Sequence, residues 1–266
     1  MLKQLFSRRR KNRYGWFGDY TSWEKVREKA AGYDSNVILE RTTNALLKVK
    51  LGEAVYERDS VLFDKKVYPY PLMAYLSLSR NLKKQPLNIL DFGGSLGSTY
   101  YQLREILTPD VCASYNVVEQ EHYVTSGNAN FANDTLKFYR SIDACLAEKE
   151  IDFVLLSSSV QYLEQPHPFL EKLAGYNFDF ILFDRTAFNK QSFDRLTLQI
   201  VPPEIYPASY PAWFFHEEFF LSHFSGMYKV AAEFSSYVEG EAVMYIDNKP
   251  SGADKGFYLI NRTIHA

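Results

Sequence analysis

The chain contains only two cysteines, Cys112 and Cys145, which lie far apart and belong to no CxxC motif. We therefore expect neither a disulfide framework nor a metal site, and the composition is compatible with a reducing, cytoplasmic environment. Long apolar runs are also missing, because none approaches the roughly 18 residues of a membrane-spanning helix. The formal net charge of -2 gives no reason to expect nucleic acid as a partner.

The N-terminal stretch MLKQLFSRRRKNR carries six basic side chains but no apolar segment of the kind found in secretory signals. Two interpretations remain open. The stretch is either a solvated tail or a weak, peripheral contact with an anionic membrane surface.

The composition is that of a globular protein, with 46% hydrophobic and 23% charged residues among 266. This length suits one large domain, or one domain with an extension. Tyrosine and phenylalanine each occur 20 times. Such abundance favours either flat contact surfaces and clefts or a core rich in aromatic rings, and the composition does not separate the two.

From residue 86 onwards, apolar strands alternate with amphipathic helices. Strands are predicted at 87–92, 114–119, 135–140, 151–158 and 178–184, and helices at 98–107, 121–131, 141–150 and 167–174. Continuous Val, Ile, Leu and Phe runs indicate strands that are buried on both faces of a parallel sheet. Residues 228–237 and 256–262 are expected to form an antiparallel pair at the sheet edge. The predicted fold of 86–266 is therefore α/β, Rossmann-like and doubly wound.

Residues 1–85 differ from the rest, because helical spacing dominates them. Apolar residues at 38–49 follow the period of a helix, with Ser35 and Asn36 as candidate caps. A second helix is predicted at 70–84, with Pro71 in its first turn. We expect this segment to be a helical extension that covers the α/β domain.

The stretch LDFGGSLG, residues 90–97, ends the first predicted strand with an acid and three glycines. Glycines let a ligand approach the backbone, and open α/β sheets bind ligands at the carboxyl ends of their strands. A dinucleotide loop, GxGxxG, would require glycine where Ser95 and Ser98 stand. The alternative pattern, D/E-x-G-x-G-x-G, matches at Asp91, Gly93 and Gly97, with Ser95 in place of the middle glycine and Gly94 between them.

Other polar residues stand where the next strands end. Glu119 ends the second strand and can accept hydrogen bonds from both hydroxyls of a ribose. Asp143, after the third strand, is a candidate acceptor for an adenine amino group, or else a first-turn helix acid. Ser158, at the end of the fourth strand, completes the predicted cofactor-binding set.

These residues resemble class I S-adenosylmethionine (SAM) dependent methyltransferases, whose glycine loop has the second pattern. IDFVLLSSSVQYLEQPHPFL, residues 151–170, also resembles their fourth strand and following helix, with Gln161 where histidine is frequent. The whole chain resembles a narrower family of methyltransferases found among bacterial surface-polysaccharide and lipopolysaccharide genes. The segments that carry this likeness are YGWFGDYTSWEKV, DSVLFD and PPEIYPASYPAWFF. The resemblance implies SAM as the cofactor and a sugar or glycan as the acceptor.

A sugar hydroxyl needs a base before it can accept a methyl group, because it keeps its proton at neutral pH. The candidates are His167 and Asp184, ranked above His216, and each has a structural alternative as a cap, a surface ion pair or a solvated side chain.

Aromatic residues cluster at 14–23 and 206–220, where they either shape an acceptor site or dock the N-terminal segment onto the sheet. The predicted acceptor-binding residues are Arg185, Tyr210, Trp213 and His216.

Three function classes follow. The first is a SAM-dependent O-methyltransferase that acts on a sugar hydroxyl. The second is a non-catalytic protein with the same fold that binds or assembles partners of a polysaccharide pathway. The third is a nicotinamide-linked sugar oxidoreductase, which the failed GxGxxG pattern disfavours.

Overall fold

The computed structural model describes residues 12–30 and 35–264, without the side chains of Ser35 and Asn36. The predicted caps at 35 and 36 and most of the basic N-terminal stretch therefore lie outside the described side chains. Within the described chain, no helix combines the length and apolarity that crossing a membrane requires. Both cysteines are buried and free.

The centre of the molecule is a parallel sheet with the strand order β6-β5-β4-β7-β8. Its strands are β4 (Leu87–Phe92), β5 (Cys112–Val118), β6 (Leu136–Tyr139), β7 (Phe153–Ser157) and β8 (Phe180–Asn189). The chain runs from β4 outward through β5 to β6, then returns to β7 on the other side of β4. Strand order therefore reverses at β4, which confirms the predicted doubly wound architecture.

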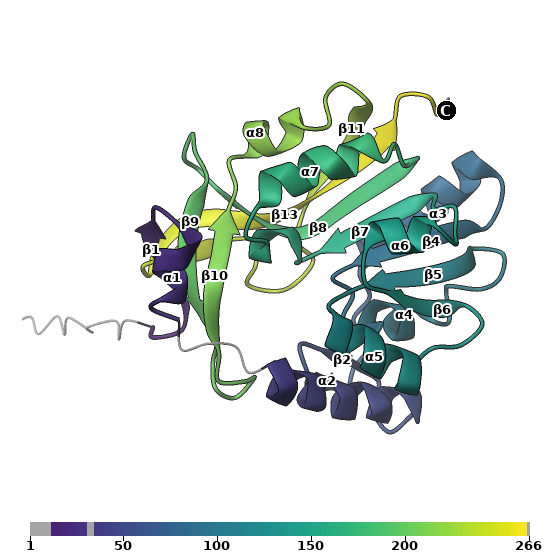
Figure 1. The fold of residues 1–266 in the computed structure, drawn as a ribbon, viewed down its shortest axis with the longest axis horizontal. Helices are drawn as coiled ribbons and strands as arrows, with labels where there is room; N and C mark the ends of the chain where they lie inside the picture. Colours follow the sequence, from purple (N-terminus) through teal and green to yellow (C-terminus); the bar gives the residue numbers. More distant parts are fainter. Residues whose placement is uncertain (1–11, 31–34, 265–266) are drawn as a thin grey trace, which may run out of the picture.

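Helices cover both faces of this sheet (Figure 1). One face packs against α3 (Tyr70–Lys83), α4 (Ser98–Leu103) and α5 (Glu121–Asn130), and the other against α6 (Ile142–Leu146), α7 (Pro166–Gly175) and α8 (Glu217–Ser222). Successive strand residues alternate between the two cores, as Ile89 and Leu90 do. Because both cores are apolar, the strands read as continuous apolar runs.

The predicted antiparallel pair is present, but one of its two strands, β13, lies inside the sheet and not at its edge. β11 (Tyr228–Ser235) pairs with β13 (Lys249–Asn261), which also pairs with β8. The first residues of β13 pair with β12 (Met244–Ile246), and the sheet continues from there through β1, β9 and β10. The prediction began this strand at 256 because residues 249–255 are mostly polar or small and lack an apolar run.

The prediction that residues 1–85 form a helical extension is incomplete, because this segment also supplies an internal strand of the sheet. β1 (Gly15–Tyr20) lies between β12 and β9 (Arg195–Ile200), and β10 (Ser209–Phe214) forms the outer edge. Gly15 and Gly18 both have positive φ, so β1 is irregular and its sequence does not show a regular strand pattern. The short helix α1 (Trp23–Arg27) then packs against β10 through stacked rings of Trp23 and Trp213.

The next N-terminal elements pack beside the loop that follows β4. α2 (Ser35–Lys50) contributes Leu46 and Val49 to the core of one sheet face. A hairpin of β2 (Tyr56–Arg58) and β3 (Val61–Phe63) follows, and Asp59 and Ser60 make its turn, both at positive φ. These elements bring N-terminal side chains to the carboxyl ends of the parallel strands.

Candidate functional site

The loop after β4 alternates left-handed positions with ordinary ones. Gly93, Ser95 and Gly97 have φ of 74°, 55° and 89°. Gly94 is needed for a different reason, because a Cβ there would lie 2.5 Å from Cγ of Asp91. The three left-handed positions are those at which the pattern D/E-x-G-x-G-x-G has glycine, so Ser95 takes the backbone conformation of the residue it replaces.

Asp91 lies beneath this loop and is 2% exposed. Its Oδ2 accepts a hydrogen bond from the hydroxyl of Tyr115 at 2.7 Å. Burial, opposed by the Tyr115 hydrogen bond and assisted by the nearby Glu119, raises the pKa of Asp91 to about 7. The carboxyl is therefore poised to ionise when a positive charge enters the site.

Glu119 directly follows β5, as predicted for a strand-end acid. Its carboxylate accepts a hydrogen bond from the backbone N–H of Gln120 at 2.7 Å, and the backbone N–H of Ser95 also donates to it. Burial raises the pKa of Glu119 above its usual range. The glycine loop and the end of β5 are thus joined through this one side chain.

A cavity of about 220 Å³ lies beside the loop, and Asp91, Glu119, Glu57 and Arg58 help to line it. Glu57 comes from β2 and is 3% exposed, in contact with the hydroxyl of Ser98 and with the backbone N–H of Ser60 at 3.0 Å. Burial raises its pKa to about 7. Glu57 could not be selected from the sequence, because only the fold brings β2 to the strand ends.

A larger cleft of about 890 Å³ continues from this cavity, and both are lined by Asp59, Gly93, Glu119, Ser157, Arg185 and Tyr206. Of the predicted site residues, Ser158 and Tyr210 also line the cleft. Its remaining wall comes from the other half of the sheet, including Trp16 of β1 and Gln199 of β9. The parallel strand ends therefore form one side of the cleft, and the additional strands form the other.

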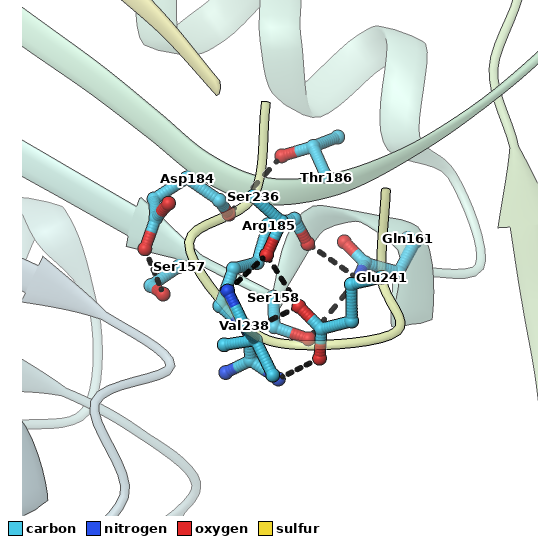
Figure 2. A network of polar contacts seen from close by, with 9 residues as sticks. All are labelled: Ser157, Ser158, Gln161, Asp184, Arg185, Thr186, Ser236, Val238 and Glu241. Atoms are coloured by element: carbon cyan, nitrogen blue, oxygen red, sulfur yellow. Dashed lines mark hydrogen bonds and ion pairs between the residues drawn. The ribbon is translucent and has the colours of Figure 1, made fainter. Parts of the chain in front are cut away.

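Arg185 lies at the junction between the two sides, where β8 does not end as predicted but continues to Asn189. The residue has a φ of 49°, and its guanidinium makes two hydrogen bonds to Glu241, at 3.0 and 2.9 Å (Figure 2). Burial opposes ionisation of Glu241, but the Arg185 pairing outweighs it and lowers the pKa of Glu241. Glu241 comes from the segment between β11 and β12, so this pair fastens that segment to the cleft wall.

Asp184, a predicted base, is buried next to Arg185. Its Oδ2 accepts a hydrogen bond from the hydroxyl of Ser157 at 3.0 Å, and its Oδ1 has no partner. Burial raises the pKa of Asp184 to about 6. Gln161 lies on the other side of Arg185 and donates from Nε2 to the Ser158 hydroxyl and to the Arg185 carbonyl, each at 3.2 Å.

Besides Gly97 and the buried Asp184, four predicted site residues lie outside the residues that line the cleft and the cavity: Asp143, His167, Trp213 and His216. Nδ1 of His167 lies 2.9 Å from Nε2 of His223, and its Nε2 contacts Asp194. His216 caps α8 and donates its backbone N–H to Asp194 at 2.7 Å. These two histidines therefore gather around Asp194, away from the residues that line the cleft.

The other two of these residues have structural partners as well. Trp213 donates from Nε1 to the carbonyl of Leu163 at 3.1 Å and stacks on Trp23, so it docks α1 onto the sheet. The exposed Asp143 binds Lys172 at 2.7 Å and the hydroxyl of Tyr176 at 2.6 Å. Both of its oxygens are engaged there, away from the cleft, which corresponds to its alternative as a helix acid.

The described residues contain no group of three or more His, Cys, Asp or Glu side chains placed to hold a metal ion.

No protein-family model matches the chain, and no match is found among curated proteins. Among solved structures, the chain is similar to a SAM-dependent methyltransferase from Clostridium acetobutylicum, at 9% identity and a TM-score of 0.46, over 73% of this chain and 92% of that one. It is also similar to CalS10, an amino pentose methyltransferase from Micromonospora echinaspora, at 10% identity and a TM-score of 0.47, over 73% and 92%. The N-terminal domain of EvdMO1, solved with SAH and D-fucose, has 12% identity and a TM-score of 0.44, over 86% and 97%. Since each TM-score is below 0.5, the functional argument rests on the residues of this chain.

Proposed function

We propose that this protein is a SAM-dependent methyltransferase that transfers the methyl group to a hydroxyl of a sugar or glycan. The observation that carries the proposal is the loop at the point where strand order reverses. Its left-handed positions fall at 93, 95 and 97, and Glu119 stands at the end of the neighbouring strand. This spacing is that of a SAM loop, and a dinucleotide loop would place its glycines differently.

The charges of the smaller cavity suit this cofactor. SAM carries a sulfonium and an ammonium group, and three carboxyls with raised pKa values, Glu57, Asp91 and Glu119, line the cavity. Arg58 lines it as well and is a candidate partner for the carboxylate of the cofactor. A side chain at position 93 would clash with Ser159, since a Cβ there would lie 2.7 Å from Cβ of Ser159.

The protein need not activate the methyl group, because a methyl group bound to a sulfonium is already a strong electrophile. SAM supplies that electrophile, while this chain aligns the acceptor and excludes water. Glu119 is placed to bind the ribose hydroxyls, and the larger cleft leaves room for an acceptor beside them. The sequence resemblance supports a role in surface-glycan synthesis, which would place the acceptor among the sugars of that pathway.

The cofactor assignment is tested by calorimetry with SAM. Glu119→Ala removes hydrogen bonds to the ribose, each worth about 1.5–3 kcal/mol, so we expect affinity to fall by at least tenfold. Gly93→Val forces a β-branched side chain into a left-handed position against Ser159 and should abolish binding. Gly175→Ala is the control, because a Cβ at Gly175 has no atom within 4 Å. Unchanged affinity in both folded variants would show that SAM binds elsewhere, and no binding by the parent protein would refute the cofactor itself.

A further inference from the structure

The larger cleft concentrates buried oxygens that have no hydrogen-bond partner. Such atoms occur in four residues that line it: Ser159, Gln161, Gln199 and Asp254. A buried polar atom without a partner costs about 1–3 kcal/mol, and such groups in native proteins usually have a functional reason. A ligand that satisfies these atoms would recover that free energy on binding.

The chemistry of these atoms defines what the ligand must offer. Nε2 of Gln161 donates to the carbonyl of Arg185, which can only accept, so the orientation of the amide is fixed. The unpartnered atom of Gln161 is therefore its carbonyl oxygen, an acceptor. An ionised Asp254 is likewise only an acceptor. The ligand must consequently bring hydrogen-bond donors, and hydroxyl groups are the neutral donors that a sugar carries.

The charges around Asp254 act against an anionic ligand. Four titratable groups interact with Asp254. They are Asp184 and Arg185 of β8, Glu241 of the segment before β12, and Tyr162 of the 3-10 turn η1 (Val160–Tyr162). The one cation among them, Arg185, is already paired with Glu241. A carboxylate or phosphate brought here would meet unbalanced negative charge.

Asp254 itself has the position and environment of a base. It lies on β13 and is 5% exposed. Its pairing partner is Ala187 of β8, which stands three residues after Asp184 in the same strand. Burial raises the pKa of Asp254 well above its usual range, and Glu241 and Asp184 raise it further against the effect of Arg185. A carboxylate with a raised pKa accepts a proton more readily than an ordinary one, which suits a general base.

Aromatic rings close the cleft beside these polar atoms. The rings of Tyr162 and Tyr210 meet edge to face, with centroids 5.4 Å apart, and Trp16 lines the same cleft from β1. Flat apolar faces next to oriented acceptors form the usual combination for binding a sugar ring.

Resting on the methyl transfer proposed above, we propose that Gln161, Gln199 and Asp254 form a subsite for an uncharged, polyhydroxylated ring. Asp254 takes the proton of the hydroxyl that is methylated. The oxygen–methyl bond forms as the sulfonium–methyl bond breaks, which leaves neutral S-adenosylhomocysteine (SAH). The proton moves from the hydroxyl to the carboxylate of Asp254 and then to water, so charge and atoms balance.

The subsite is tested by saturation-transfer difference NMR on the full chain saturated with SAH. The probes are the methyl glycosides of glucose, galactose, mannose and rhamnose, each compared with glucuronate and galacturonate. We expect at least one neutral glycoside to bind, and at least fivefold more tightly than either uronate. Gln161→Leu should weaken that binding by at least fivefold and leave SAH affinity unchanged. Uronates that bind as well as the glycosides, or no binding by any glycoside, would overturn the subsite.

The base is tested with the best-binding glycoside by following SAH release. Asp254→Asn should lower kcat by at least a hundredfold with less than a threefold change in SAH affinity, whereas the surface variant Asp110→Asn should match the parent. Formate should partly restore turnover to Asp254→Ala, which a merely structural role would not allow. A loss of kcat below tenfold, or no formate rescue, would refute the role of Asp254. Absence of SAH binding by the parent protein would instead refute the proposed cofactor, so the two failures are distinguishable.

Discussion

At the residue scale, the glycine loop shows why one departure from the expected pattern is tolerated. Ser95 replaces a glycine yet keeps the left-handed φ of 55°, at a cost of roughly 1–2 kcal/mol for a residue with a Cβ. Its backbone N–H donates to Glu119, so the strained position holds the strand-end acid in place. The loop keeps its geometry because the conformation, and not the glycine itself, positions this donor.

The acids of the smaller cavity predict that cofactor binding depends on pH. Burial raises the pKa values of Asp91 and Glu57 from 3.8 and 4.5 to about 7, so the folded protein holds these protons more tightly than the unfolded chain. Without ligand, stability should therefore decrease as pH rises from about 4 to about 7. A cationic cofactor favours the ionised carboxyls, so SAM binding should release protons and strengthen by up to about tenfold per pH unit for each proton released over that window.

Calorimetry between about pH 5 and pH 8, in buffers of different ionisation enthalpy, measures this proton release. Glu57→Gln keeps the size of the side chain but removes one titrating group, so it should flatten the dependence, and Asp110→Asn should leave it unchanged. An affinity that is independent of pH, with no proton exchange, would show that these carboxyls do not meet the positive charges of SAM.

At the element scale, sequence-based prediction was accurate where a strand is a continuous apolar run. β4 was predicted residue for residue at 87–92, because both of its faces are apolar and a glycine ends it. β8 was predicted to stop at Asp184, yet it continues through Arg185, where a positive φ interrupts the regular strand. A charged residue after an apolar run resembles a strand end in the sequence, and only pairing with β13 shows otherwise.

Selection of the candidate site residues depended on the same feature, the ends of the apolar runs. Asp91, Gly93, Glu119 and Ser158 could be selected because they lie at or directly after the ends of parallel strands, and all four line the cavity or the cleft. Asp254, proposed above as the base, could not be selected because it lies inside β13, in a segment whose sequence has no strand pattern. His167 was selected for its position after β7, but α7 carries it to Asp194 instead.

The structural role of Trp213 gives a prediction about docking of α1. Trp213→Phe loses the hydrogen bond to Leu163 and part of the stacking on Trp23, worth about 1 kcal/mol each. We expect the free energy of unfolding to fall by roughly 1–2 kcal/mol, measured by urea denaturation, with SAM affinity unchanged. If instead stability were unchanged and binding of the acceptor weakened, Trp213 would be part of the acceptor site after all.

At the scale of the whole molecule, the additional strands convert an open sheet edge into a cleft. β1 and β12 are joined by the pairing of Trp16 with Ile246, near opposite ends of the chain. Pairing at such separation leaves no local pattern in the sequence, which explains why residues 1–85 were predicted to be a helical cover. The larger cleft exists only because these distant segments meet.

This arrangement predicts that residues 86–266 do not fold by themselves. Without the first 85 residues, β9 and β12 lose the strand between them, and the sheet face that Leu46, Val49, Leu72 and Leu76 cover becomes exposed. We expect that fragment to aggregate, because large exposed apolar patches are not tolerated in monomers. Removal of residues 1–11 alone retains every described element and should leave SAM affinity unchanged. Size-exclusion chromatography, thermal melting and SAM calorimetry on both truncations measure this. A soluble 86–266 fragment that melts cooperatively and binds SAM as the full chain does would show that β1, α2 and α3 are dispensable, and that the parallel sheet alone holds the cofactor.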